Sequence, residues 1–329
     1  MTALAPTLQK FFTDRLVLQR RVSPHTIAAY RDTFRLLLEH VHTMTKIPPT
    51  QLDLGYLDAE VVTGFLTHLE QDRGNSIRTR NMRLAAIHSF YAFAAFEHPE
   101  HAVLIQRVLA IPSKRYDKAI ISWLTDTELT ALVMSPDTST WLGLRDHALL
   151  TTAAQTGLRV SELTALTIDH VSLNAGAHVT CVGKGRKHRA TPLTTSTVKV
   201  LRAWFNEHDG SPTDPVFPTR QYQRLSTDAV AKLLRKHVRT AAISCPSLAM
   251  KTVTPHILRH TAAMRLLHAG ADVATIALWL GHESMETTGI YLHADMTIKQ
   301  RALDRPTPIG GKTGRYQAPD KLMAFLESL

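Results

Sequence analysis

Thr156-Gly-Leu-Arg-Val-Ser-Glu-Leu163 stands at the point where the hydrophobic pattern of this 329-residue chain changes. The residues before it show helical spacing from about Thr140, and Gly157 suits the left-handed position that ends a helix. Three segments after it predict short strands: His170–Leu173, His178–Val182 and His188–Leu193. The pattern therefore predicts a mixed, mostly helical domain with a small three-stranded antiparallel sheet.

The first ~110 residues show helical periodicity throughout. Ser23 followed by Pro24 is a strong helix start, because a serine hydroxyl caps the first turn and proline suits its first position. Asp58 and Ser76 can cap two further amphipathic segments, and an earlier helix is expected over Leu8–Arg20. Together these segments predict a mainly α chain that begins with a four- or five-helix bundle.

A polar segment without periodicity, Ile111–Lys118, follows this bundle. Thr125 and Glu128 form a capping-box pattern just after it, which indicates the start of a second domain. We therefore expect a helical domain over residues 1–111, a linker over 112–120, a second domain over 121–303 and a tail over 304–329. Helices of the second domain are expected to resume near Thr195, Thr227, Pro255, Asp272, Met285 and Thr297.

The composition is basic, with 38 Lys and Arg against 28 Asp and Glu and a formal charge of +10. A pI of about 9.7 favours a polyanionic partner such as nucleic acid, although a basic enzyme of another kind is the simpler alternative. Residues 1–118 carry 15 of the basic and 11 of the acidic side chains, so both parts of the chain would contact such a partner. The hydrophobic content of 44% excludes a disordered or collagen-like protein.

Two cysteines, Cys181 and Cys245, are too few for a disulfide framework or a cysteine-based zinc site. A reducing compartment, and hence a cytoplasmic location, is therefore expected. The sequence shows no signal peptide and no run of 18 apolar residues, so no association with a membrane is expected.

Arg159 follows the predicted helix end, and Glu162 lies three residues later. A guanidinium can bind two phosphate oxygens at once while a nearby carboxylate fixes its orientation. An ordinary surface ion pair is the alternative for this pair taken alone.

Gly183-Lys-Gly-Arg-Lys-His-Arg189 concentrates cationic side chains in one predicted turn. Its glycines would let the backbone approach a ligand closely. The spacing does not fit a Walker phosphate loop, which has four residues between its first glycine and Gly-Lys-Ser/Thr. A solvated basic turn is the alternative. The cationic residues are Lys184, Arg186, Lys187 and Arg189.

Thr254-Pro-His-Ile-Leu-Arg-His-Thr261 places His256 and Arg259 on one face of a helix. This pairing suits a proton-transfer group beside a phosphate-binding cation. His256 and His260 also have the spacing of a zinc pair, but Ile257 stands where the His-Glu-x-x-His motif has its glutamate. No metal is therefore expected, and packed helix histidines are the remaining alternative.

Leu280-Gly-His-Glu-Ser-Met-Glu-Thr-Thr-Gly-Ile-Tyr-Leu-His293 contains a helix end at Gly281, with His282 at the break and Tyr291 nine residues later. Tyrosine is a poor nucleophile at neutral pH because its pKa is near 10. Cationic neighbours that stabilise the phenolate can change this. A buried tyrosine with a hydrogen-bonded hydroxyl is the alternative.

In this order and spacing the four motifs resemble those of the tyrosine recombinases, the phage integrase family. The resemblance covers residues ~120–300. It extends more loosely to Ser23–Tyr30 and Ser76–Leu84, which look like the family's core-binding domain. It implies two domains that form a C-shaped clamp around duplex DNA, and a homo-tetramer assembled on two DNA sites.

The resemblance also implies an enzyme that cuts and rejoins duplex DNA at specific sites through a 3′-phosphotyrosyl intermediate, without a cofactor. Tyr291 would attack the phosphate, Lys184 would protonate the leaving 5′-oxygen, and His256 would take the tyrosine proton or share in proton transfer. Glu162 would orient the other side chains. The implied catalytic set is Arg159, Lys184, His256, Arg259, His282 and Tyr291.

The natural role implied is integration or excision of a mobile element, or resolution of DNA dimers. Two alternatives remain at this point: a type IB topoisomerase-like nicking and closing enzyme, and a DNA-binding architectural protein without catalysis. Further cationic side chains are expected to contact DNA, mainly at phosphates. They are Arg78, Arg80, Arg83, Arg186, Lys187 and Arg189.

The chain ends in Lys321-Leu-Met-Ala-Phe-Leu-Glu-Ser-Leu329, whose apolar residues fall at helical spacing. So short a helix is not stable alone in water and needs a surface to pack on. That surface is either its own domain or, as the family resemblance implies, a neighbouring protomer.

Overall fold

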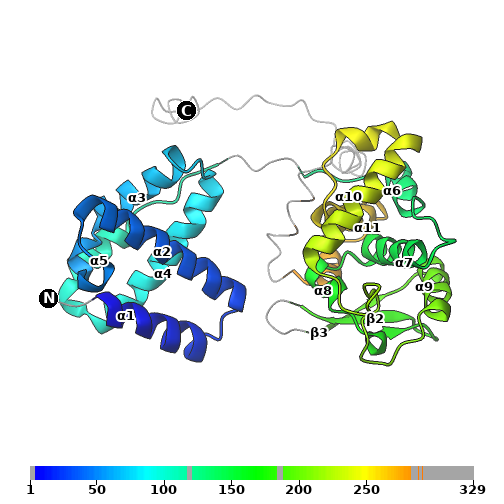
Figure 1. The fold of residues 1–329 in the computed structure, drawn as a ribbon, viewed down its shortest axis with the longest axis horizontal. Coiled ribbons are helices and arrows are strands. Elements are labelled where there is room, and N and C mark those ends of the chain that lie inside the picture. Colours follow the sequence, from blue (N-terminus) through cyan, green and yellow to red (C-terminus); the bar gives the residue numbers. More distant parts are fainter. Residues whose placement is uncertain (1–3, 117–120, 184–187, 283–287, 289–290, 292–329) are drawn as a thin grey trace, which may run out of the picture. The chain divides into compact units, whose positions relative to one another are not determined.

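The computed structural model describes residues 4–116, 121–183 and 188–282, together with Thr288 and Tyr291. The chain divides into two compact units, Met1–Ala119 and Ile120–Leu329, and each is described here by itself (Figure 1). No helix of the described ranges is long and apolar enough to cross a membrane.

The first unit is a helical bundle, as its periodicity predicts. Its predicted caps are present, since the side chains of Ser23, Asp58 and Ser76 each accept a main-chain N–H of the following helix. The helix expected over Leu8–Arg20 starts earlier and continues as a π-helical stretch, Phe11–Gln19. The helices are α1 (Leu4–Lys10), α2 (Pro24–Thr45), α3 (Ala59–Gln71), α4 (Ile77–Glu97) and α5 (Ala102–Leu109).

Buried phenylalanines fill the centre of this bundle. Phe11, Phe34 and Phe90 are each at most 2% exposed. Their ring centroids lie 5.2–6.3 Å apart in edge-on arrangements. Because aromatic rings bury large apolar areas and favour this geometry, they join the π-helical stretch, α2 and α4 in one core.

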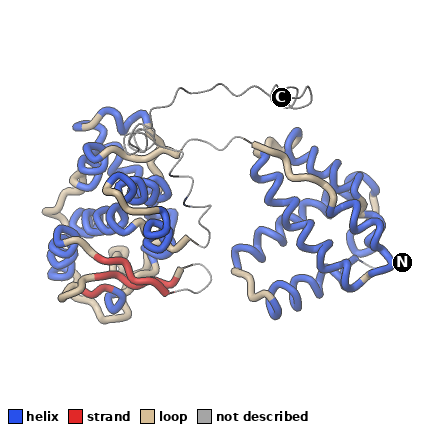
Figure 2. Tube along the Cα trace, turned by 180° about the vertical axis from the view of Figure 1, so that it is seen from behind, coloured by secondary structure: helices blue, strands red, loops and turns tan. Residues whose placement is uncertain are grey.

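The second unit contains the predicted sheet and most of the predicted helices. Strands β1 (Val171–Ser172), β2 (His178–Val182) and β3 (His188–Pro192) are antiparallel in the order β1-β2-β3. Figure 2 shows these strands, in red, at one end of the unit. The helices are α6 (Asp126–Val133), α7 (Trp141–Thr156), α8 (Val160–Thr164), α9 (Thr195–Glu207), α10 (Thr227–Ser244), α11 (Pro255–His268) and α12 (Val273–Leu280).

The mainly helical fold with a small antiparallel sheet is thus confirmed. Thr125 caps α6 in a full capping box, and Gly157 ends α7 with a φ of 63°. Helix α8 was not predicted, because five residues are too few to show a hydrophobic period. The helices expected near Met285 and Thr297 lie almost entirely outside the described residues.

Helix α7 positions the candidate site. It packs against α9 and α11, and the three helices lie in the second unit of Figure 1. Gly157, at its carboxyl end, lies close to the side chains of Leu280 and Ala262, which belong to α12 and α11. Helices α7, α11 and α12, which carry described parts of three of the four motifs, therefore meet where α7 ends.

Candidate active site

Arg259 lies in the centre of the candidate site and is 5% exposed. It belongs to the second turn of α11, a helix that Thr254 caps and Pro255 begins. Its Nη1 donates to the main-chain carbonyl of Gly157 and its Nη2 to that of Leu280, each at 2.7 Å. These carbonyls end α7 and α12, where the helix dipole favours a cation. Burial, followed by the nearby charge of Arg159, lowers the pKa of Arg259 to about 10, so it stays cationic at neutral pH.

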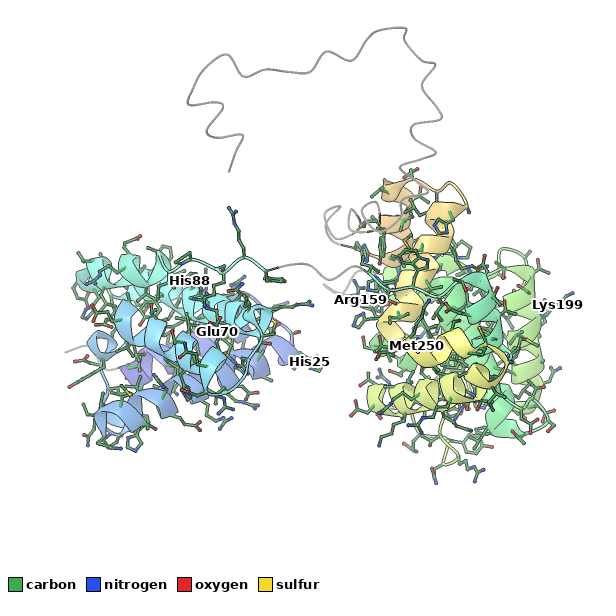
Figure 3. The ribbon with its side chains drawn as sticks, turned by 90° about the horizontal axis from the view of Figure 1, so that it is seen from above. His25, Glu70, His88, Arg159, Lys199 and Met250 are labelled. Atoms are coloured by element: carbon green, nitrogen blue, oxygen red, sulfur yellow. The ribbon has the colours of Figure 1, made fainter. Side chains whose placement is uncertain are left out.

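Arg159 lies beside Arg259 and is more accessible, with 27% of its side chain exposed. Its Nη2 donates to the carbonyl of Gly281 at 3.1 Å, one residue beyond the carbonyl that Arg259 binds. Figure 3 labels Arg159 among the side chains of the second unit. The two guanidiniums therefore converge on the end of α12, and one of them is open to solvent.

Glu162 holds two arginines in place. Its carboxylate, 4% exposed, accepts from Arg159 Nη1 at 2.9 Å and from Arg189 Nη1 and Nη2 at 3.1 and 2.7 Å. Burial alone would raise the pKa of Glu162, but the hydrogen bonds from Arg189 and Arg159 outweigh it and lower that pKa. The carboxylate is therefore ionised, and it accepts hydrogen bonds from the guanidiniums of both Arg159 and Arg189.

Arg189 is largely buried, whereas a contact with DNA requires an exposed side chain. We expected a DNA contact, yet its side chain is only 10% exposed and binds Glu162 through both terminal nitrogens. Strand β3 brings it next to α8, so its charge is matched inside the protein. The other cations of the turn, Lys184, Arg186 and Lys187, lie outside the described residues.

Tyr291 is buried, with 1% of its surface exposed. Its hydroxyl lies 3.0 Å from Nδ1 of His260, and its ring stacks on that of His282 with centroids 6.3 Å apart. Burial raises the pKa of Tyr291, while the charges of Arg259 and Arg159 act in the opposite direction. The phenol is therefore protonated at neutral pH. The charges of both arginines favour its ionised form.

The histidine on the tyrosine hydroxyl is His260, whereas the sequence suggested His256. His256 is exposed, and its ring centroid lies 6.5 Å from that of His260. The sequence did contain one indication of His260, because the i, i+4 spacing places it on the same face of α11 as His256. That spacing fits a zinc pair equally well, so it did not identify His260 as the partner of the tyrosine. Within the described part of the chain, no group of three or more His, Cys, Asp or Glu could hold a metal ion.

His282 lies in the site next to the break after α12. Its Nδ1 is 2.7 Å from the hydroxyl of Thr288. Burial, then the charges of Arg259 and Arg159, lower its pKa to about 4, so the ring is neutral at neutral pH. When Thr288 donates to Nδ1, the hydrogen of His282 lies on Nε2, where it can donate to a phosphate oxygen.

The three arginines predicted to contact DNA from the first unit are not equivalent. Arg78 is exposed, as a phosphate contact requires. Arg80 is 5% exposed and donates to the carbonyl of Pro112 at 3.1 Å. Arg83 is half-buried and donates to the hydroxyl of Thr33 at 3.1 Å. The helical period turns the latter two toward the body of the bundle, which the arginine cluster alone does not reveal.

Two family models cover both units of the chain. The phage integrase family model matches residues 122–297, and the model of the phage integrase N-terminal SAM-like domain matches residues 10–98. The putative integrase/recombinase y4rC of Sinorhizobium fredii is 51% identical over 327 residues, which cover 99% of this chain and 98% of the relative. The tyrosine recombinase XerC of Chlamydia muridarum is 32% identical, with 90% and 96% covered.

Solved structures show the same fold. The recombinase XerH, in a post-cleavage complex with its palindromic difH substrate, has a TM-score of 0.70 at 22% identity, covering 87% of this chain and 81% of that one. The Tn1549 transposon integrase in complex with transposon right end DNA has a TM-score of 0.68 at 15% identity, covering 93% and 99%. Neither alternative, a topoisomerase-like enzyme or a silent architectural protein, is favoured by these similarities. The chain belongs to the phage integrase family and is a DNA-breaking and rejoining tyrosine recombinase.

Proposed function

We propose that Tyr291 is the nucleophile of this recombinase and that Arg159 and Arg259 hold the scissile phosphate of duplex DNA. The observation that carries this assignment is the convergence of both guanidiniums on the carbonyls of Leu280 and Gly281, with their charges acting on the Tyr291 phenol. Cations that are fixed before the reaction stabilise the charge that develops on phosphate without reorganising.

In the proposed reaction, the Tyr291 oxygen gives up its proton, which passes through solvent to the exposed His256. The oxygen then forms a bond to phosphorus, and the bond from phosphorus to the 5′-oxygen breaks. Lys184 gives a proton to that oxygen, and His282 donates a hydrogen bond to a phosphate oxygen. Attack by a 5′-hydroxyl of a partner strand reverses these steps and rejoins the DNA. The phosphotyrosyl bond conserves the energy of the broken phosphodiester, so no cofactor is required.

The partner proposed is a double-stranded recombination site, which a core-binding domain over residues 1–111 and a catalytic domain over 121–303 would each contact. A homo-tetramer on two such sites would carry out strand exchange in the cytoplasm, for integration or excision of a mobile element or for dimer resolution. The basic charge of both parts of the chain supports contact of each with DNA. The tail over 304–329, outside the described residues, would pack on a neighbouring protomer.

A covalent-trapping experiment tests the assignment of the nucleophile. The substrate is a nicked suicide duplex, chosen by sequencing the DNA that the unchanged protein captures covalently. Tyr291→Phe should form no detergent-resistant adduct while binding the duplex as before, because the substitution removes a single hydroxyl. Tyr222→Phe, at an exposed tyrosine of the same unit, is the matched control and should form the adduct normally. An adduct on Tyr291→Phe would refute the proposal.

A further inference from the structure

We propose that His260 is a positioning residue for strand cleavage, which accepts a hydrogen bond from the Tyr291 hydroxyl and holds the nucleophile without taking its proton. This inference rests on the proposed role of Tyr291. Nδ1 of His260 lies 3.0 Å from the hydroxyl oxygen, and the two rings meet edge-on at 5.6 Å and 65°. The histidine therefore fixes both the oxygen and the plane of the phenol.

The helix that carries His260 is fixed on both sides of this residue. Arg259, immediately before it, binds the carbonyls of Gly157 and Leu280. Thr261, immediately after it and fully buried, accepts from the main-chain N–H of Leu124 at 3.0 Å. One turn of α11 therefore fixes the position of the phosphate-binding guanidinium of Arg259 relative to the imidazole of His260, which accepts from the nucleophile. Such fixed geometry is what brings reacting atoms together efficiently.

The electrostatics of the pair favour positioning over proton transfer. Burial, then the nearby His256 and Arg259, lower the pKa of His260 to about 4, whereas burial raises that of Tyr291 above 10. Moving the phenolic proton to this imidazole is therefore strongly unfavourable in the structure described. A neutral imidazole can instead offer the Nδ1 lone pair to the hydroxyl hydrogen and hold the oxygen in place until its proton leaves to another acceptor.

Two substitutions separate the roles that His260 could have. His260→Phe keeps a planar ring but removes the acceptor, and His260→Asn places an amide oxygen close to the position of Nδ1. The rate to measure is single-turnover adduct formation on the nicked suicide duplex, with the protein saturated by DNA. His260→Phe should slow this rate roughly 2- to 10-fold, the effect of one neutral hydrogen bond, and His260→Asn should restore most of it.

Other outcomes would overturn the inference. A loss of about 10²–10⁴-fold in both variants would mean that His260 takes the proton, and an unchanged rate in His260→Phe would mean that the contact does not matter. His268→Phe, at the other end of α11, is the matched control and should cleave normally. Unfolding curves and DNA affinity should match between the His260 variants, which separates the rate effect from misfolding.

A duplex with sulfur in place of the bridging 5′-oxygen tests the same point independently. A thiolate leaves without a proton, so this substrate should restore cleavage to Lys184→Ala but leave the defect of His260→Phe in place. Restoration of His260→Phe would show that His260 acts on the leaving group and would overturn the inference. The Tyr291→Phe control keeps the two proposals apart, because an adduct on that variant refutes the nucleophile whatever His260 does.

Discussion

Glu162 gives the site its charge balance. Among the described residues it is the one carboxylate bonded to the arginines of the site, while Arg159, Arg189 and Arg259 supply three positive charges. The remaining positive charge faces main-chain carbonyls at two helix ends. Carbonyl dipoles offset a cation only partly, so the site retains an excess of positive charge that a phosphate can match.

Replacing Glu162 with glutamine should destabilise the second unit by about 3 kcal/mol, since the change leaves buried arginine charge without a partner. The pKa of Glu162 is lowered in the folded protein. Its contribution is therefore present above the unfolded pKa of about 4.5 and is lost as the pH falls through the folded value. The deficit of Glu162→Gln should accordingly shrink below about pH 4.5.

Urea unfolding followed by tryptophan fluorescence measures this effect, because all four tryptophans lie after residue 120 and report the second unit alone. Asp126→Asn is the matched control. Asp126 pairs with Arg265 at 2.9 Å, but the two side chains are 79% and 51% exposed. Removing this exposed pair should cost less than about 1 kcal/mol. Equal losses in the two variants would show that Glu162 does not balance buried charge.

Local signals in the sequence predict the ends of helices well. Ser23, Ser76 and Thr125 cap the helices that they were expected to cap, because an N-cap depends on side-chain and main-chain groups a few residues apart. The partners of Arg189 and His260 could not be predicted in this way. Arg189 meets Glu162 across 27 positions of sequence, and His260 meets Tyr291 across 31. Such contacts depend on how β3 and α11 pack, which periodicity does not encode.

The carboxyl end of α7 provides a sensitive test of that packing. Gly157 has a φ of 63°, and a Cβ there would lie 2.7 Å from Leu280 Cδ2 and 3.1 Å from Ala262 Cβ. Gly157→Ala should therefore destabilise the second unit by more than the ~1 kcal/mol that a left-handed alanine costs. It should also slow DNA cleavage, because the Gly157 carbonyl is a ligand of the Arg259 guanidinium.

Gly176→Ala separates the two contributions. Gly176 has a φ of 74° in the turn before β2, and a Cβ there would meet no atom within 4 Å. This variant should show the conformational cost alone and cleave DNA at the normal rate. The measurements are the urea unfolding midpoints and the single-turnover cleavage rates of the two variants. Equal midpoints and equal rates for Gly157→Ala and Gly176→Ala would argue against the close contact with α12.

Each unit of the chain has its own hydrophobic core, one built on Phe11, Phe34 and Phe90 and the other on residues such as Leu149, Leu201 and Trp204. Removing residues 1–119 should therefore leave a second unit that still folds, which its tryptophan fluorescence will report. The charge of the chain predicts what such a truncation does to DNA binding. Fifteen of the 38 Lys and Arg lie in residues 1–118, and some of them would bind DNA phosphates in the proposed function.

The salt dependence of affinity measures those contacts directly, because each phosphate that a cation neutralises releases counterions. With about 6–10 contacts, the affinity of the whole chain should fall roughly 10³–10⁵-fold between about 50 and 200 mM salt. The truncated protein should bind more weakly and with a flatter slope.

Arg78→Ala, at an exposed position, should flatten the slope of the whole chain by about 1. Arg80→Ala is its matched partner: because Arg80 is buried against Pro112, its loss should lower the stability of the first unit and leave the slope unchanged. A truncated protein with the full slope would show that the first unit does not bind DNA phosphates.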